Sequence, residues 1–217
     1  MADFATLRRK MVDNQLRTSN VTDHRVLAAM GEVPRETFVP EARRELAYSD
    51  LSHQLGGGRA LGAPAPFAKL LQLAEIAHDD NVLDVGGGTG YAAAVLARLA
   101  RRVTLIEPDP RLAALARDNL GALGVANAGV IEAALDGVAL EPGSFDVVVV
   151  DGALDREPTG LLKLLSDGGR LVALVRNGPA SSARLYRRSG NDIGARGEFN
   201  TTLPPLMPAD ANEAFVF

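Results

Sequence analysis

The residues with the clearest chemical potential are two acids and a run of glycines. Residues 84–90 read DVGGGTG after a short apolar stretch, and Glu107 ends the next apolar stretch, 23 positions after Asp84. Glycines that follow a strand let the backbone approach a ligand closely at a strand-to-helix turn. A carboxylate at the end of the following strand can accept hydrogen bonds from both hydroxyls of a ribose. This spacing predicts a nucleoside-binding site.

Two classes of nucleoside ligand fit glycines of this kind. The NAD fingerprint GxGxxG/A can be aligned with Gly88, Gly90 and Ala93, so the glycine spacing alone does not choose between them. Asp84 lies two residues before Gly86, where its charge opposes a pyrophosphate and suits a cationic ligand. A ligand with a ribose and a positive centre but no phosphate is S-adenosylmethionine. The alternative is a structural glycine turn with a solvated Glu107. The residues predicted to bind this cofactor are Asp84, Gly86, Gly87, Gly88, Gly90, Tyr91, Glu107 and Pro108.

The acid and glycine pattern resembles that of class I methyltransferases, and upstream residues narrow the resemblance. Residues 11–12 (MV), 22–30 (TDHRVLAAM), 33–40 (VPRETFVP) and 47–50 (AYSD) are similar to the N-terminal region of protein-L-isoaspartate O-methyltransferases, as are Gly56, Gly58 and Pro64. The resemblance extends over residues 10–175. It implies a cytoplasmic repair enzyme that methylates the free carboxyl group of isoaspartyl residues in proteins or peptides.

The chain departs from this family in the loop that would hold the substrate. The family's loop reads Gly-Gln-Thr-Ile-Ser-Gln-Pro, whereas residues 58–64 read GRALGAP. Gly62 replaces the serine that is thought to hold the substrate carboxylate, and Ala60 replaces the threonine. Arg59 could substitute, because a guanidinium binds a carboxylate through two parallel hydrogen bonds; a solvated loop arginine is the alternative. The family's Gly-Asp-Gly, thought to reach adenine, falls on residues 133–135 (AAL) or 134–136 (ALD).

Two other residues, with Arg59, are candidates for catalysis on a different acceptor. Asp151 ends a predicted strand, where its charge would repel an anionic substrate, and His53 could act as a base for a hydroxyl group. The plainer interpretations are a cap or turn residue for Asp151 and a solvent-exposed loop histidine for His53. Three functions therefore stay open: isoaspartyl methylation, methyl transfer to another small acceptor, and cofactor binding without transfer.

Composition excludes several other classes of protein. The 217 residues include no cysteine and only three histidines, which excludes a cysteine nucleophile and predicts no metal site. A net charge of −4 provides no basic field for nucleic acid or anionic lipid. The N-terminal residues MADFATLRRKMVDNQ lack the apolar core of a signal peptide. We expect a cytoplasmic protein, monomeric or a small homo-oligomer, with no nucleic-acid or membrane partner.

The elements that must position these residues are typical of an α/β fold. Alternating strands and helices predict a doubly wound, Rossmann-like sheet, mostly parallel, with an antiparallel C-terminal edge. We expect one methyltransferase domain over residues 1–217, with a helical cap and substrate loop (1–66), a cofactor-binding core (67–180) and a sheet-edge tail (181–217). Helices are expected at residues 4–18, 23–30, 67–77, 90–101, 110–124 and 157–166, strands at 81–85, 102–106, 128–132, 145–150 and 170–175, and irregular chain at 37–66.

Overall fold

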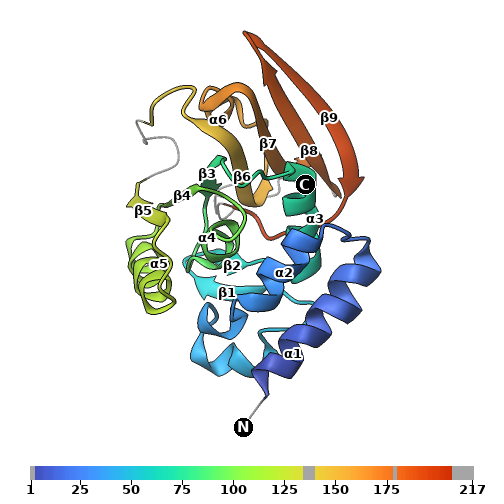
Figure 1. Cartoon of the computed structure of the whole chain (residues 1–217), viewed down its shortest axis with the longest axis vertical. Coiled ribbons are helices and arrows are strands. Elements are labelled where there is room, and N and C mark those ends of the chain that lie inside the picture. The colour runs from blue at the N-terminus through green and yellow to red at the C-terminus, as the bar shows by residue number, and fades with distance from the viewer. Residues whose placement is uncertain (1–2, 134–139, 178–179, 207–217) are drawn as a thin grey trace, which may run out of the picture.

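A computed structural model shows a seven-stranded sheet with helices packed against it (Figure 1). It describes residues 3–133, 140–177 and 180–206. The strand order is β5-β4-β3-β6-β7-β8-β9, and pairing is parallel from β5 to β7 and antiparallel from β7 to β9. The predicted doubly wound fold with an antiparallel C-terminal edge is confirmed. In the part of the chain that is described, no helix is both long and apolar enough to cross a membrane.

Strands and helices alternate through the core as the sequence predicts, and the long β8–β9 hairpin projects beyond the helices (Figure 1). The N-terminal elements are α1 (Phe4–Met11), η1 (Val12–Leu16), η2 (Arg17–Ser19), α2 (His24–Glu32), η3 (Arg35–Thr37), η4 (Glu41–Leu46), β1 (His53–Gly56), β2 (Arg59–Leu61) and α3 (Pro64–Ala74). The core elements are β3 (Asn81–Val85), α4 (Tyr91–Leu96), β4 (Arg102–Glu107), α5 (Pro110–Ala122), β5 (Ala128–Glu132), β6 (Phe145–Leu154), α6 (Thr159–Leu162), β7 (Leu165–Asn177), β8 (Ala180–Ser189) and β9 (Asp192–Asn200).

Two predictions of secondary structure are wrong. The helix expected at 157–166 is the four-residue α6, because Leu165 is buried and pairs with Phe145 as the start of β7. The chain expected to be irregular at 37–66 contains a hairpin, in which β1 pairs antiparallel with β2. Gly56, Gly57 and Gly58 turn this hairpin with φ of +93°, +61° and +75°, a conformation that glycine adopts readily. The division into cap, core and tail stays a prediction.

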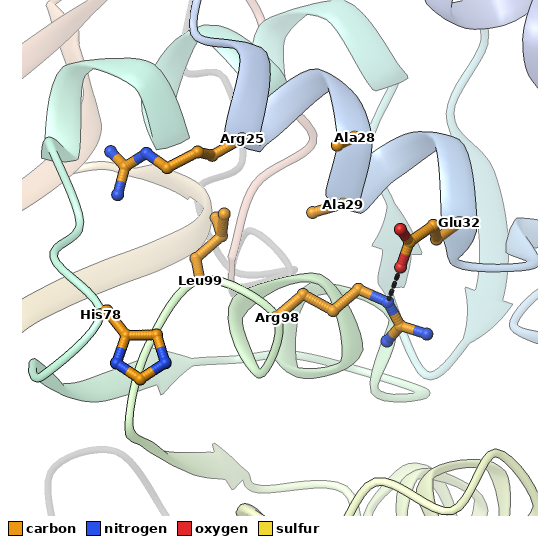
Figure 2. Close-up of a pocket in the computed structure, with 7 residues that line it drawn as sticks. All are labelled: Arg25, Ala28, Ala29, Glu32, His78, Arg98 and Leu99. Carbon is orange, nitrogen blue, oxygen red and sulfur yellow. Dashed lines mark hydrogen bonds and ion pairs between the residues drawn. The ribbon is translucent and has the colours of Figure 1, made fainter.

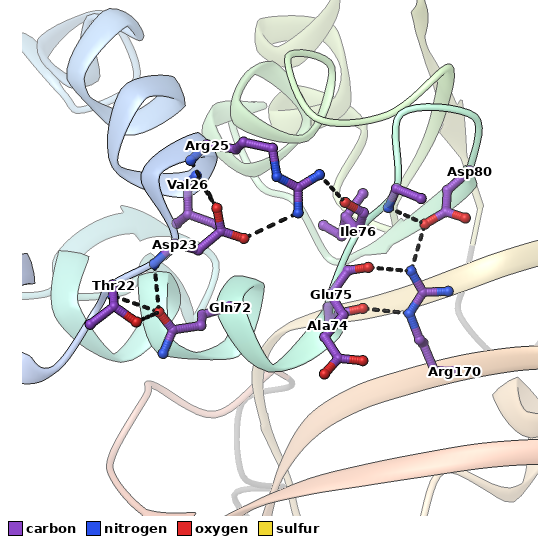
Figure 3. A network of polar contacts seen from close by, with 11 residues as sticks. Thr22, Asp23, Arg25, Val26, Gln72, Ala74, Glu75, Ile76, Asp80 and Arg170 are labelled. Carbon is purple, nitrogen blue, oxygen red and sulfur yellow. Dashed lines mark hydrogen bonds and ion pairs between the residues drawn. The ribbon is translucent and has the colours of Figure 1, made fainter.

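The N-terminal helices are fixed by a cap and by contacts with α3. The Asp23 carboxylate accepts a hydrogen bond from the backbone N–H of Arg25 at 2.8 Å, as expected for a residue that starts α2. The side-chain oxygen of Gln72 in α3 accepts hydrogen bonds from the backbone N–H groups of Thr22 and Asp23, which joins the start of α2 to α3 (Figure 3).

The sheet separates two apolar cores, and the chain after β9 passes from one to the other. The larger core contains buried residues of the N-terminal elements and of α3, α4 and α5, whereas the smaller one lies on the opposite face of the strands. Leu203 packs in the larger core and Leu206 in the smaller core. Residues 203–206, which we call the strap, therefore cross the edge of the sheet where β3 and β6 end.

A partly buried arginine, Arg170 of β7, ties the sheet to the end of α3 (Figure 3). Its guanidinium donates to the carbonyl oxygens of Ala74 and Glu75 at 2.5 and 2.6 Å and to Asp80 Oδ2 at 2.7 Å. The Asp80 carboxylate is held in turn by the backbone N–H of Ala77. Because Asp80 is buried, loss of Arg170 would leave an uncompensated charge.

We therefore expect Arg170→Ala to lower the free energy of unfolding by about 3 kcal/mol, measured by urea denaturation. Arg187→Ala is a matched control, because Arg187 faces Arg170 across β7 and β8 and pairs with Glu75 in solvent. It should cost about 0–1 kcal/mol. Equal losses in the two variants would contradict this account of the network.

Candidate cofactor and methyl-transfer site

The glycine turn lies between β3 and α4, at the carboxyl edge of the sheet. Gly86, Gly88 and Gly90 have φ of +76°, +57° and +95°, which lets the backbone turn sharply after Val85. A Cβ at Gly90 would lie 3.3 Å from the backbone of Ala116, so the turn also packs closely against α5. The backbone N–H groups of this turn are thereby placed at the strand ends, where ligands bind in open α/β sheets.

Glu107 and Asp84 are both fully buried at this turn. Glu107 Oε2 accepts from the backbone N–H of Gly88 at 2.8 Å, and Oε1 accepts from that of Asp109 at 3.1 Å. The alternative of a solvated Glu107 is therefore wrong. Neither carboxylate oxygen of Asp84 has a hydrogen-bond partner among the described residues. Burial, reinforced by the charges of Asp151 and Glu107, raises the pKa of Asp84 well above its ordinary value.

Arg59 reaches this acid pair from β2. Its Nη2 donates to Glu107 Oε2 at 3.1 Å and to the carbonyl oxygen of Gly86 at 2.5 Å, and its Nη1 donates to the carbonyl oxygen of Leu206. Only 4% of Arg59 is exposed, so the alternative of a solvated loop arginine is wrong. The side chain contacts the predicted cofactor residues instead of standing free to bind an acceptor carboxylate.

The strap lies directly against the glycine turn. Ala153 of β6 donates its N–H to the carbonyl oxygen of Pro204 and accepts from the N–H of Leu206, both at 2.8 Å. A Cβ added to Gly86 would overlap Leu206 Cδ1 and would lie 2.7 Å from Arg59 Nη2. The space beside the first glycine is therefore filled by two side chains of this chain.

The other two predicted catalytic residues are also buried. His53 begins β1 and is 3% exposed, so it is not the exposed loop histidine of the plainer interpretation. Burial and the nearby charge of Arg35 lower the pKa of His53, and its Nε2 has no partner within the described part of the chain. Asp151 lies inside β6 instead of in a turn or cap. Burial raises the pKa of Asp151 to about 6, although Arg59 and Arg35 oppose the shift.

Arg35 is a site residue that the sequence analysis did not single out. It is fully buried, and it donates to the carbonyl oxygens of Ala47 and of Gly62 in the substrate loop. Its guanidinium lies 4.8 Å from the centre of the Tyr91 ring. Its Nη1 has no hydrogen-bond partner among the described residues. The signal was present in VPRETFVP, where a charged residue stands inside a motif of the family resemblance.

The remaining residues predicted from the sequence lie around the glycine turn and the substrate loop, apart from those outside the described residues. The Tyr91 ring packs against Phe38 and Phe67, with centroids 5.6 and 6.0 Å apart, which directs it into the apolar core. Pro108 is half-buried after Glu107. A Cβ at Gly62 would lie 2.5 Å from Leu203 Cδ2, so the strap also covers the substrate loop. Of the residues aligned with the family's Gly-Asp-Gly, 134–136 lie outside the described residues.

A separate cavity of about 310 Å³ lies between α2 and the chain after α4 (Figure 2). Its cationic groups are already engaged. Arg98 Nε pairs with Glu32 at 3.0 Å, and Arg25 Nη1 donates to the carbonyl oxygen of Ile76 at 2.7 Å. The lining residues are Arg25, Ala28, Ala29, Glu32, His78, Arg98 and Leu99, none of which belongs to the glycine turn. Across the described ranges, no three acids or histidines come together as metal ligands would.

Comparison with known proteins shows that the sequence of this chain matches one family. Residues 6–202 match the family model described as protein-L-isoaspartate(D-aspartate) O-methyltransferase. A protein-L-isoaspartate O-methyltransferase of Koribacter versatilis is 42% identical over 194 residues, which cover 89% of this chain and 87% of that protein. A Rhodopseudomonas palustris protein of the same name, numbered 1, is 39% identical over 210 residues, with coverage of 94% and 84%.

Solved structures show the same fold. A putative protein-L-isoaspartate O-methyltransferase of Plasmodium falciparum, solved with S-adenosyl-L-homocysteine, aligns with a TM-score of 0.79 over 93% of this chain and 99% of that one, at 21% identity. Another structure titled protein-L-isoaspartate O-methyltransferase aligns with a TM-score of 0.76 over 91% of this chain and 65% of that one. From the extent of the family match and the identity to its members, the chain belongs to the protein-L-isoaspartate O-methyltransferase family.

Proposed function

We propose that this chain transfers the methyl group of S-adenosylmethionine to the free carboxyl group of isoaspartyl residues in cytoplasmic proteins or peptides. The observation that carries the proposal is the buried pair Asp84 and Glu107 at the glycine turn, in a chain that matches the family over residues 6–202. When bound, the cofactor supplies an electrophilic methyl group, whose transfer to a carboxylate forms a methyl ester and leaves a neutral thioether.

The chemistry of the acid pair fits this cofactor. Glu107 presents a carboxylate at the end of β4 for the two ribose hydroxyls. Asp84, which has no hydrogen-bond partner among the described residues, suits a cationic ligand, because a nearby positive charge favours its ionised form and opposes the rise in pKa that burial causes. The glycines allow close approach of the backbone. The space beside Gly86 is filled by the side chains of Arg59 and Leu206.

The acceptor needs alignment more than it needs a base. A carboxyl group with a pKa of roughly 4 is ionised near neutral pH, so it is already a nucleophile. The loop lacks both hydroxyls, at Ala60 and Gly62. Arg35 is a second source of binding energy, because it is cationic, it holds the Gly62 carbonyl, and its Nη1 is unpartnered within the described part of the chain. We propose Arg35 as the group that compensates for the lost hydroxyls.

A different acceptor is a second candidate, and two observations favour it. Asp151 is ionised above a pKa of about 6 and then repels an anionic substrate. His53, with its lowered pKa and a free Nε2 among the described residues, is a neutral base that can accept a proton from a hydroxyl group. A substrate with a hydroxyl acceptor would use both features.

Glu107→Gln should weaken S-adenosylmethionine binding by about 10- to 150-fold in calorimetric titration. The variant removes a charged acceptor, whose hydrogen bonds are each worth about 1.5–3 kcal/mol. Glu32→Gln is a matched control, because Glu32 forms an exposed ion pair on α2 and should leave the affinity unchanged. Unchanged binding by the Glu107 variant would remove Glu107 from the cofactor site.

Restoring the loop hydroxyls should raise isoaspartyl methylation. Gly62→Ser with Ala60→Thr should increase kcat/KM by about 10-fold or more, measured as labelled methyl transfer to an isoaspartyl peptide, with the aspartyl peptide as control. The new Cβ at position 62 meets Leu203, so adding Leu203→Ala should increase the gain. Absence of transfer by the wild type and by both variants would exclude the isoaspartyl acceptor.

The affinity for an anionic acceptor should depend on the protonation of Asp151. Below its pKa of about 6 this carboxyl is neutral, so the KM for an isoaspartyl peptide should be about tenfold lower at pH 5 than at pH 7.5. The peptide carboxylate itself remains mostly ionised at pH 5. Asp151→Asn should lower KM at pH 7.5 and flatten the profile. A profile that the substitution leaves unaltered would assign the titration to another group, such as His53.

A further inference from the structure

We propose that Arg59 and the strap are an internal occupant of the cofactor site, which S-adenosylmethionine must displace in order to bind. The inference rests on the proposed function, because it concerns the same site. It follows from three contacts that converge on the glycine turn: Arg59 with Glu107, Arg59 with Leu206, and Leu206 with Gly86.

The first contact is a competition for the Glu107 carboxylate. Its Oε2 accepts from both Gly88 and Arg59, and its Oε1 accepts from Asp109. An ionised carboxylate offers about four acceptor positions, and three are in use. Two ribose hydroxyls therefore cannot both be accommodated while Arg59 remains bonded. Displacing Arg59 frees one acceptor position on Glu107.

The contact of Leu206 with Gly86 is steric. Leu206 is 1% exposed, and its Cδ1 occupies the position that a Cβ on Gly86 would take. Its carbonyl oxygen also accepts from Arg59 Nη1. The arginine and the leucine thus close the site together, and movement of either one removes a contact that holds the other.

The backbone of the strap is bonded to the sheet more sparsely than the core strands are bonded to one another. Among the described residues it joins β6 through one isolated bridge between Ala153 and Pro205, with two backbone hydrogen bonds, whereas β6 and β7 pair over most of their length. Segments with few backbone hydrogen bonds open locally with a smaller free energy than core strands do. Opening therefore leaves the sheet intact.

This competition predicts that cofactor affinity is limited by the fraction of molecules that are open. The apparent Kd equals the intrinsic Kd divided by that fraction, so variants that favour the open form bind more tightly. We expect Arg59→Ala and Leu206→Ala each to lower the Kd for S-adenosylmethionine at least tenfold in calorimetric titration.

The matched control is Arg170→Ala. Arg170, like Arg59, is an arginine with little exposure that donates to one carboxylate and two backbone carbonyls, but it lies at the end of α3 instead of at the glycine turn. Its loss reproduces any general effect of removing such a group, and the Kd should stay within twofold of wild type. Circular dichroism at the titration temperature verifies that each variant is folded.

Hydrogen exchange provides a readout that needs no substitution. The amides of Ala153 and Leu206 are bonded across the strap, so both should exchange faster when S-adenosylmethionine is added to the wild type. Slower or unchanged exchange would overturn displacement, as would variants that bind no more tightly than wild type; the cofactor site would then still stand. Absence of binding by wild type, Arg59→Ala and Leu206→Ala alike would overturn the proposed function, and displacement with it.

Discussion

The buried carboxylate of Glu107 is the constraint on which the rest of the site depends. It fixes the end of β4 to the glycine turn through Gly88 and to the start of α5 through Asp109. A buried charge requires partners, because an isolated one costs several kcal/mol, and the hairpin supplies Arg59. Glu107 therefore explains two features. It provides the carboxylate of the nucleoside site, and its pairing with Arg59 of this chain fills that site.

The closure extends to the acceptor side of the site. Leu203 covers Gly62 and Leu206 covers Gly86, so one short segment contacts both the substrate loop and the glycine turn. Arg35 holds the same loop by its hydrogen bond to the Gly62 carbonyl oxygen. The loop that lacks both hydroxyls is thus contacted by an apolar side chain, Leu203, and by a buried cation, Arg35.

The sequence predicts the centre of the parallel core well, because its strand contains a continuous apolar run, 147–150, that is buried on both faces. It also places Asp84 and Glu107 together, since their strands are neighbours and end at one edge. It misses the β1–β2 hairpin, whose strands of four and three residues carry too little periodicity. The contact of Arg59 with Leu206 spans 147 positions, and only tertiary packing can reveal it.

The most direct test of displacement at the glycine turn is a crystal structure of this chain with S-adenosyl-L-homocysteine. We predict that both ribose hydroxyls lie within hydrogen-bond distance of Glu107, that Arg59 has left this carboxylate, and that Leu206 has moved away from Gly86. A nucleoside bound elsewhere, or bound while Arg59 still pairs with Glu107, would contradict it.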